Sequence, residues 1–397
     1  MRPNRKLSLV PPYLFTAIDN KVAAARAAGR DVISLGVGDP DLPTPQPIVD
    51  AMHKAIDDPA THNYPPSLGA MDFRKAAAQW MKTRFGVDAD PATEIMTLIG
   101  SKEGIAHLIT AFVEPGDVVL APSPGYPVYR TYTLISGGEP FILPLEAKNN
   151  FLPDYSKIPA DVLKRAKILF LNYPNNPTGA LAPESFIKES IDFCRKNDLL
   201  LCHDNAYSEM TFDGYRAPSF LSVPGAKDVC IEMFSLSKMY NMTGWRIGFA
   251  VGNKQALEAL AVVKTNCDSN AFKAIQTASA TALGMSDKLL ETVNPVYARR
   301  RDIMVAGLRD MGWPDVSAAA TFYLWVPVPE GTSDPDFVTL LLEKCDIVVA
   351  PGSGYGDAGK GFFRIALTQS EDRLREVVKR MKAAGISYAP VKKAQSA

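Results

Sequence analysis

The sequence predicts an α/β fold, in which a large domain with a mostly parallel, helix-covered sheet precedes a smaller α+β domain. Two observations favour this fold. From Glu94 to Phe234, short apolar runs alternate with helical patterns, which is the order of strands and helices in a parallel sheet. Beyond them, the helical pattern from Asp287 to Met311 contains no glycine before Gly307 and predicts a long helix that joins two domains. A chain of 397 residues is long enough for both domains.

The chain divides into three predicted parts. Residues 1–35 form an N-terminal arm, which we expect to pack against the small domain or a partner subunit. Within this arm, Thr16 to Ala28 has a helical pattern and Val32 to Leu35 reads as a short strand. Residues 36–286 form the large domain, and residues 287–397 form the small C-terminal domain.

Polar or aromatic residues follow the strand ends of the predicted large domain. Ligands of parallel sheets bind beyond the carboxyl ends of the strands. Gly100, Tyr126, Asn176, Asp204 and Lys238 all lie at such ends, so we expect one shared site there. The strands are predicted at Glu94–Ile99, Val118–Ala121, Ile168–Leu171, Leu199–Cys202 and Val229–Phe234, and the helices at Gln46–Ile56, Asp72–Phe85 and Ile105–Phe112 and from near Pro183.

The predicted small domain contains one arginine inside an apolar strand. Its strands are expected at Thr321–Val326, Ile347–Ala350 and Phe362–Leu367, and an amphipathic helix follows at Glu371–Ala384. Arg364 lies within the third strand, where it is either part of a structural ion pair or a receptor for a carboxylate.

Composition excludes several classes of function. Lys+Arg and Asp+Glu are equal at 43 each, so no net charge attracts nucleic acid or an anionic membrane. No apolar run is long enough to span a bilayer, and the N-terminus does not resemble a signal peptide. The five cysteines are scattered, as expected for reduced thiols in a cytoplasmic protein. Without a CxxC pair or a His/Cys cluster, we predict no metal site.

The stretch from Phe234 to Gly248 combines two kinds of chemistry. Ser235, Ser237 and Arg246 suit a phosphate, because hydroxyls and a guanidinium donate several hydrogen bonds to a dianion. Lys238 lies between them and suits a carbonyl group, because a desolvated amine forms a Schiff base. Pyridoxal 5′-phosphate (PLP) offers both a phosphate and an aldehyde. The alternative for this stretch alone is a solvated loop.

Three other features are ambiguous by themselves. The turn at Gly100 and Ser101 opens a helix and is either an anion site or an ordinary α/β turn. Tyr126 either stacks on a planar ligand or packs in its loop. Asp204 at the end of a buried strand either pairs with a cation or caps a helix.

Taken together, four motifs of this chain resemble the class I/II aminotransferases, which are PLP enzymes of fold type I. The motifs are Asn172–Gly179, Asp204 with Tyr207, Ser235–Gly248 and Phe363–Ile365, and the resemblance extends from about residue 10 to residue 385. It implies a transfer of an amino group between an amino acid and a 2-oxo acid. It also implies a homodimer with shared active sites.

The resemblance implies catalytic and cofactor-binding roles for individual residues. Lys238 would hold PLP as a Schiff base and then transfer the proton, and Asp204 would keep the pyridine nitrogen protonated. Tyr207 and Asn176 would bind the ring hydroxyl oxygen. Tyr126 would stack on the ring and contact the substrate, and Tyr64 would contact the cofactor. The phosphate would be held by Ser101, Lys102, Ser235, Ser237 and Arg246.

For the substrate, the resemblance implies a carboxylate clamp. Arg364 would bind the α-carboxylate, assisted by Asn176 and the backbone of Gly38. Tyr64 and Asn270 would reach across to the site of the partner subunit. Tyr13, Lys102 and Tyr64 match positions that would serve a substrate with a second amino-acid head.

Other motifs look most like the LL-diaminopimelate aminotransferases. These motifs are Pro11–Phe15, Gly36–Pro45, Asp204–Glu209 and Tyr240–Trp245. That family converts tetrahydrodipicolinate and glutamate to LL-2,6-diaminopimelate and 2-oxoglutarate in lysine biosynthesis. Aspartate, alanine and aromatic aminotransferases share most of the pattern and remain alternatives. Three further classes also remain alternatives: a PLP-dependent carbon–sulfur β-lyase, a PLP-binding regulator and an α/β binding protein without PLP.

Overall fold

A twisted sheet forms the centre of the large domain. The computed structural model describes residues 1–10 and 14–389. Within them, seven strands form this sheet in the order β2-β8-β7-β6-β5-β3-β4, and β8 alone runs in the direction opposite to the other six. The strands are β2 (Ile95–Leu98), β3 (Val118–Ser123), β4 (Glu139–Pro144), β5 (Ala166–Leu171), β6 (Leu200–Asp204), β7 (Cys230–Ser235) and β8 (Gly248–Gly252).

Helices cover both faces of this sheet because its strands are apolar on both sides. Leu169 and Leu171 of β5 enter one core cluster, whereas Ile168 and Phe170 enter another, as the two-residue period of a strand requires. The first cluster packs under α2 (Gln46–Ile56), α3 (Met71–Phe85), α7 (Glu184–Asn197) and α10 (Lys273–Gly284), and the second under α4 (Ser101–Phe112), α5 (Val128–Ser136) and α9 (Lys254–Cys267). The short helices α6 (Ala160–Leu163) and α8 (Leu236–Met239) complete the domain.

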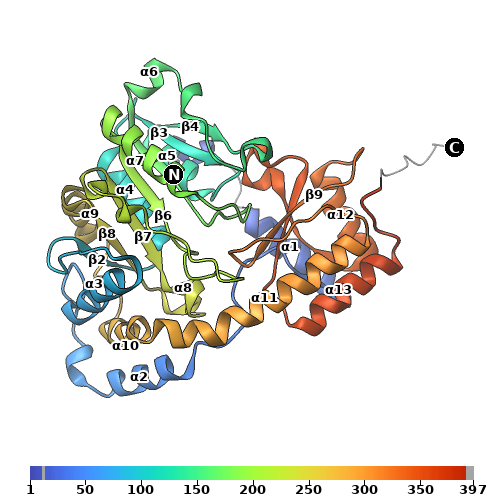
Figure 1. The fold of residues 1–397 in the computed structure, drawn as a ribbon, viewed down its shortest axis with the longest axis horizontal. Coiled ribbons are helices and arrows are strands. Elements are labelled where there is room, and N and C mark those ends of the chain that lie inside the picture. The colour runs from blue at the N-terminus through green and yellow to red at the C-terminus, as the bar shows by residue number, and fades with distance from the viewer. Residues whose placement is uncertain (11–13, 390–397) are drawn as a thin grey trace.

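The second domain is smaller and has its own core. Helix α11 (Ser286–Asp310) runs from the large domain to this small domain (Figure 1). Strand β9 (Tyr323–Pro327) pairs with β12 (Phe362–Ala366), and β12 pairs with β11 (Ala350–Pro351). The helices α12 (Asp334–Cys345) and α13 (Glu371–Ala383) pack beside this sheet.

The N-terminal arm lies against the small domain. Helix α1 (Leu14–Ala27) contributes Val22 and Ala25 to a core cluster that includes Trp325. Strand β1 (Ile33–Ser34) pairs in parallel with β10 (Ile347–Val348). The bounds of the three parts that the sequence suggests stay a prediction.

Several strands differ from their prediction. The prediction of a single strand at Ile347–Ala350 is wrong, because the chain changes sheets at Val349. Strand β10 pairs with β1 of the arm, whereas β11 pairs with β12. Strands β4 and β8 are absent from the prediction, because their short apolar runs contain or border proline and glycine, which also mark turns. None of the helices in the described part of the chain combines the length and the apolar character that crossing a bilayer requires.

Candidate active site

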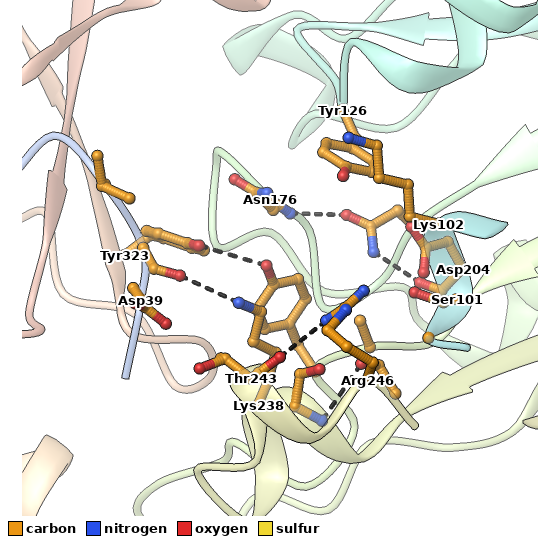
Figure 2. A pocket seen from close by; sticks show the side chains of 18 of the residues that line it. Asp39, Ser101, Lys102, Tyr126, Asn176, Asp204, Lys238, Thr243, Arg246 and Tyr323 are labelled. Atoms are coloured by element: carbon orange, nitrogen blue, oxygen red, sulfur yellow. Dashed lines mark hydrogen bonds between the residues drawn. The ribbon is translucent and has the colours of Figure 1, made fainter. Parts of the chain in front are cut away.

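A cavity of about 340 Å³ opens beyond the carboxyl ends of the large sheet. Figure 2 shows side chains of the large domain facing Asp39 and Tyr323, which come from the opposite side. The lining residues come from both domains and are Val37, Gly38, Asp39, Gly100, Ser101, Lys102, Tyr126, Asn172, Asn176, Asp204, Ala206, Tyr207, Ser235, Ser237, Lys238, Thr243, Arg246, Tyr323 and Arg364.

One end of the cavity is built to receive an anion. Ser101 opens helix α4, whose first N–H groups and dipole favour negative charge. Gly100 precedes it with φ 86°, and a Cβ atom there would approach Nη2 of Arg246 to 2.8 Å. Glycine at this position therefore leaves room for the guanidinium beside the helix start. The buried hydroxyls of Ser235 and Ser237 line the same cavity.

Asp204 ends β6 with one carboxylate oxygen available to a ligand. The side chain is buried, and its Oδ2 accepts a hydrogen bond of 2.8 Å from the hydroxyl of Tyr129. Its Oδ1 is also buried, and it has no hydrogen-bond partner within the described residues. Burial raises the pKa of Asp204 to about 6, whereas the Tyr129 hydrogen bond and the nearby His203 oppose that rise. A cationic N–H group would satisfy this oxygen.

Lys238 projects into the cavity from α8, which directly follows β7. Its Nζ donates a hydrogen bond of 3.1 Å to the backbone oxygen of Gly38 (Figure 2). Burial lowers the pKa of Lys238 to about 8; Asp39 opposes this fall, whereas Arg364 and Arg246 add to it. The amine is therefore partly neutral near physiological pH, as a nucleophile or a general base must be.

The small domain contributes Arg364 of β12 to the lining of the cavity. The side chain is fully buried in β12, and its Nη1 donates to Oδ1 of Asn176 at 2.8 Å. Its Nη2 donates to the backbone oxygen of Gly36 at 2.7 Å, and its guanidinium lies 4.0 Å from the ring centroid of Tyr323. These contacts hold a planar donor fork at the cavity wall, where it matches a carboxylate.

The cavity gathers most of the residues that the sequence singled out. Gly38, Ser101, Lys102, Tyr126, Asn176, Asp204, Tyr207, Ser235, Ser237, Lys238, Arg246 and Arg364 line it. Tyr64 and Asn270 do not line it in this chain. Tyr64 is 86% exposed, and Asn270 donates from Nδ2 to the backbone oxygen of Ser67 at 3.0 Å, so the two loops lie side by side. Tyr13 lies outside the described residues.

Sequence reasoning missed Tyr323. Its hydroxyl lies 3.3 Å from that of Tyr207, and a Cβ atom on Gly38 would come within 1.9 Å of it. The residue belongs to the apolar strand β9, so in the sequence it looks like a core tyrosine. Other lining residues that the sequence did not single out are Val37, Asp39, Asn172, Ala206 and Thr243.

The fold and the cavity define a two-domain α/β enzyme that can hold an anionic carbonyl compound against a lysine. The chain belongs to the class I and II aminotransferases, because the family described as "Aminotransferase class I and II" matches residues 30–381. The fold is accordingly fold type I, and the predicted fold class is confirmed.

Individual relatives agree with this family. The LL-diaminopimelate aminotransferase 2 of Trichormus variabilis is 56% identical over 97% of this chain and 99% of its own length. The substrate-bound structure of BacF from Bacillus subtilis is 34% identical, with a TM-score of 0.93 over 96% of this chain and 98% of that chain. A single mutant of the aspartate aminotransferase of Thermus thermophilus is 27% identical, with a TM-score of 0.90 over 97% of this chain and 100% of that one.

Proposed function

We propose that this aminotransferase uses PLP to transfer the amino group of glutamate to tetrahydrodipicolinate, with uptake of water, which gives LL-2,6-diaminopimelate and 2-oxoglutarate in lysine biosynthesis. The choice of substrate rests on the 56% identity to an LL-diaminopimelate aminotransferase over nearly the whole of both chains. The aspartate aminotransferase of similar fold is only 27% identical, although it is equally well covered. The cavity supports this activity with an amine, a carboxylate and a guanidinium in one place.

The residues of the cavity fit PLP. The anion end, with Gly100, Ser101 and Arg246, suits its phosphate. The buried Oδ1 of Asp204 suits its protonated ring nitrogen, and Lys238 suits its aldehyde. When bound, PLP supplies an electron sink for the charge that develops at the substrate Cα. Ser235, Ser237 and Lys102 would complete the phosphate site, and Tyr126 would stack on the ring.

The chain's own residues then orient the substrate and move its proton. Arg364 binds the α-carboxylate through its fork, with Asn176 and the backbone of Gly38 beside it. Lys238 would accept the Cα proton as a neutral amine and, in the second half-reaction, would return a proton to Cα of the new amino acid. Tyr207 and Asn176 would bind the ring hydroxyl oxygen. Tyr13, Lys102 and Tyr64 serve the second head of the substrate.

We propose a homodimer in which Tyr64 and Asn270 of each chain complete the partner's site. The exposure of Tyr64 supports this proposal, because the loop that carries it lies outside this chain's own cavity.

A cytoplasmic location is part of the proposal as well. It agrees with four buried cysteines, Cys194, Cys202, Cys230 and Cys345, which are free thiols in the structure.

A panel of half-reactions tests the substrate. The PLP form is mixed in turn with LL-2,6-diaminopimelate, glutamate, aspartate, alanine and phenylalanine, and the visible absorbance of the cofactor is followed. We expect rapid loss of this absorbance with LL-2,6-diaminopimelate and glutamate, because both become amino donors to the same cofactor.

One control variant and two possible outcomes decide how the panel is interpreted. Lys238→Ala should abolish turnover with every donor, because it removes the base and the covalent anchor. If LL-2,6-diaminopimelate alone caused no loss of absorbance, it would be excluded as a substrate and the protein would be a general aminotransferase. Release of pyruvate and ammonia from an added donor with a sulfur leaving group at Cβ, such as cystathionine, would instead indicate a β-lyase.

A further inference from the structure

A buried tyrosine contacts Asp204 from behind the cavity. Tyr129 lies in the first turn of α5 and is fully buried. Its ring is stacked on Phe170, with centroids 4.7 Å apart and planes 11° apart. Its hydroxyl lies 2.8 Å from Oδ2 of Asp204. Asp204 and Cys202 lie two residues apart on β6, so both side chains reach the sheet face that α5 covers.

The two oxygens of the Asp204 carboxylate have different environments. Oδ2 accepts the hydrogen bond from Tyr129, whereas Oδ1 is buried without a partner in the described part of the chain. The backbone oxygen of Asp204 accepts a further hydrogen bond of 2.6 Å from Nδ2 of Asn172, which fixes the main chain. The Tyr129 contact thus fixes the rotation of the carboxylate and leaves one oxygen to a ligand.

We propose that Tyr129 is a positioning residue for the cofactor, whose hydroxyl holds Asp204 as a carboxylate with Oδ1 turned to the ring nitrogen of PLP. This inference rests on the proposed function. Tyr129 does not line the cavity, so it acts through Asp204 and not by contact.

The surroundings of this pair keep Tyr129 protonated, and the Tyr129 hydrogen bond opposes protonation of Asp204. Burial and the neighbouring Asp204 raise the pKa of Tyr129 well above its ordinary value, so the phenol stays protonated and remains a donor. Burial raises the pKa of Asp204 to about 6, and the Tyr129 hydrogen bond and His203 both oppose this rise. The other titratable groups that face the pair are Cys202, Tyr126 and Tyr207. Loss of the hydroxyl therefore favours the neutral acid and weakens its hold on a cationic ring nitrogen.

Tyr129→Phe removes the hydroxyl and keeps the stacked ring. The holoenzyme is loaded with PLP labelled with ¹⁵N at the ring nitrogen, and its NMR shift is followed against pH. We expect the ring nitrogen to lose its proton about one pH unit lower than in the wild type, and PLP to dissociate about tenfold more readily. Adding Tyr129→Phe to Asp204→Asn should have little further effect, because the charged acceptor is already gone.

A matched control separates this role from packing. Tyr155 is also buried, stacks on Phe193 at 4.4 Å and bonds to Oγ of Ser190 at 2.8 Å, away from the cavity. Tyr155→Phe should leave the ¹⁵N titration unchanged. If Tyr129→Phe does not fold, 3-fluorotyrosine at position 129 strengthens the donor and should move the titration to higher pH.

Three results would overturn the inference. They are an unchanged titration in Tyr129→Phe or the fluorotyrosine enzyme, an equal shift in Tyr155→Phe, or full additivity with Asp204→Asn. Borohydride reduction of the wild type checks the proposed function separately. If a pyridoxyl group is found on Lys238 and Tyr129→Phe does not change the ¹⁵N titration, only the role of Tyr129 is rejected. If Lys238 carries no pyridoxyl group, the proposed function is rejected.

Discussion

The amine of Lys238 is surrounded by groups of both signs. Asp39 favours its charged form, whereas Arg364 and Arg246 disfavour it, and burial has the largest effect, so that its pKa falls to about 8. Each of these groups also has a proposed role or place in the cavity. The guanidiniums that would bind the substrate carboxylate and the phosphate therefore also help to make the amine available.

A depressed lysine pKa predicts a pH dependence for attachment of PLP to the cofactor-free protein. The neutral amine is the nucleophile, so the rate constant should rise about tenfold from pH 6 to pH 7 and level off above about pH 8. Stopped-flow absorbance measures it. Asp39→Asn removes the charge that raises this pKa and should move the midpoint to lower pH. A midpoint near the ordinary lysine value would contradict the assignment.

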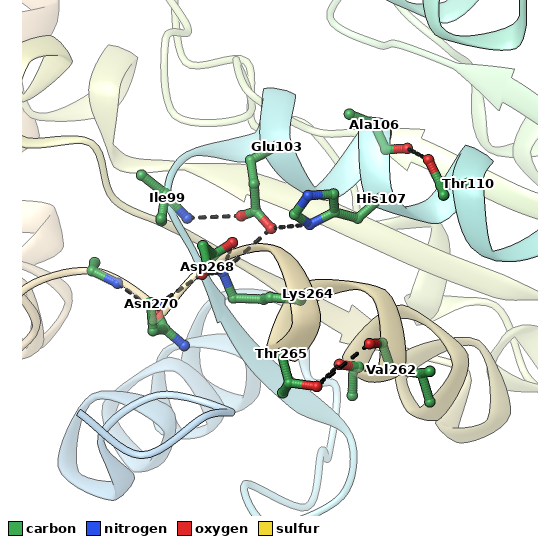
Figure 3. Close-up of polar contacts among 12 residues, drawn as sticks. Ile99, Glu103, Ala106, His107, Thr110, Val262, Lys264, Thr265, Asp268 and Asn270 are labelled. Carbon is green, nitrogen blue, oxygen red and sulfur yellow. Dashed lines mark hydrogen bonds and ion pairs between the residues drawn. The ribbon is translucent and has the colours of Figure 1, made fainter. Parts of the chain in front are cut away.

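Among the elements of the large domain, an ion cluster links the turn at Gly100 and Ser101 to the loop after α9 (Figure 3). Lys264 of α9 is fully buried, and its Nζ lies 2.8 Å from Oδ1 of Asp268 and 3.3 Å from Oε1 of Glu103. Oε2 of Glu103 accepts from the N–H of Ile99, next to the anion end of the cavity. Oδ1 of Asp268 accepts from the N–H of Asn270 at 2.7 Å.

The same cluster resembles a cation site. Ligand atoms of Glu103, His107 and Asp268 lie within 4.8 Å of one another. The ammonium group of Lys264 already contacts both carboxylates, so it supplies the positive charge that a metal ion would bring. Lys264 is therefore better interpreted as the centre of a structural cluster.

Lys264→Met should destabilise the large domain, because it leaves two carboxylates close together without their cation. We expect the free energy of unfolding to fall by about 3 kcal/mol, measured by thermal unfolding of the holoenzyme in EDTA. The control is Lys254→Met on the same helix, since Lys254 is exposed and lies 4.0 Å from Glu258. Adding Glu103→Gln and Asp268→Asn should restore most of the loss. Equal effects of Lys264→Met and Lys254→Met would refute this role.

At the scale of the molecule, the site needs two domains and contacts between distant segments. The large domain supplies Lys238 and Asp204, whereas β12 and β9 of the small domain supply Arg364 and Tyr323. The buried Arg300 of α11 pairs with Asp41 at 2.6 Å, which ties the connecting helix to the segment that carries Gly38.

The placement of residues after strand ends could be predicted from the sequence, because parallel strands bring their carboxyl ends to one edge. Tyr129 and Tyr323 could not be found this way. Tyr323 lies in an apolar strand, and Tyr129 lies in the first turn of a helix that mixes polar and apolar residues. Only the fold brings the Tyr129 hydroxyl to Asp204 and the Tyr323 hydroxyl to Tyr207. The roles of Tyr64 and Asn270 depend on a second chain and stay a prediction.

Complementation between subunits tests the shared site. Lys238→Ala and Tyr64→Ala chains are co-expressed with different affinity tags, and the hybrid dimer is purified. If Tyr64 acts across the interface, one site of the hybrid carries both defects and the other is intact. The hybrid should then have about half of the wild-type turnover per dimer, whereas each mutant homodimer is impaired.

The control hybrid pairs Lys238→Ala with Asn176→Ala. Asn176 is buried in the same cavity as Lys238 and contacts Arg364 of its own chain, so each site of this hybrid carries one defect. It should recover no activity beyond that of the Asn176→Ala homodimer. If the Tyr64 hybrid behaved in the same way, Tyr64 would act within its own chain or not at all, and its exposure would need another explanation. Recovery in the Tyr64 hybrid alone would identify the dimer as the catalytic unit.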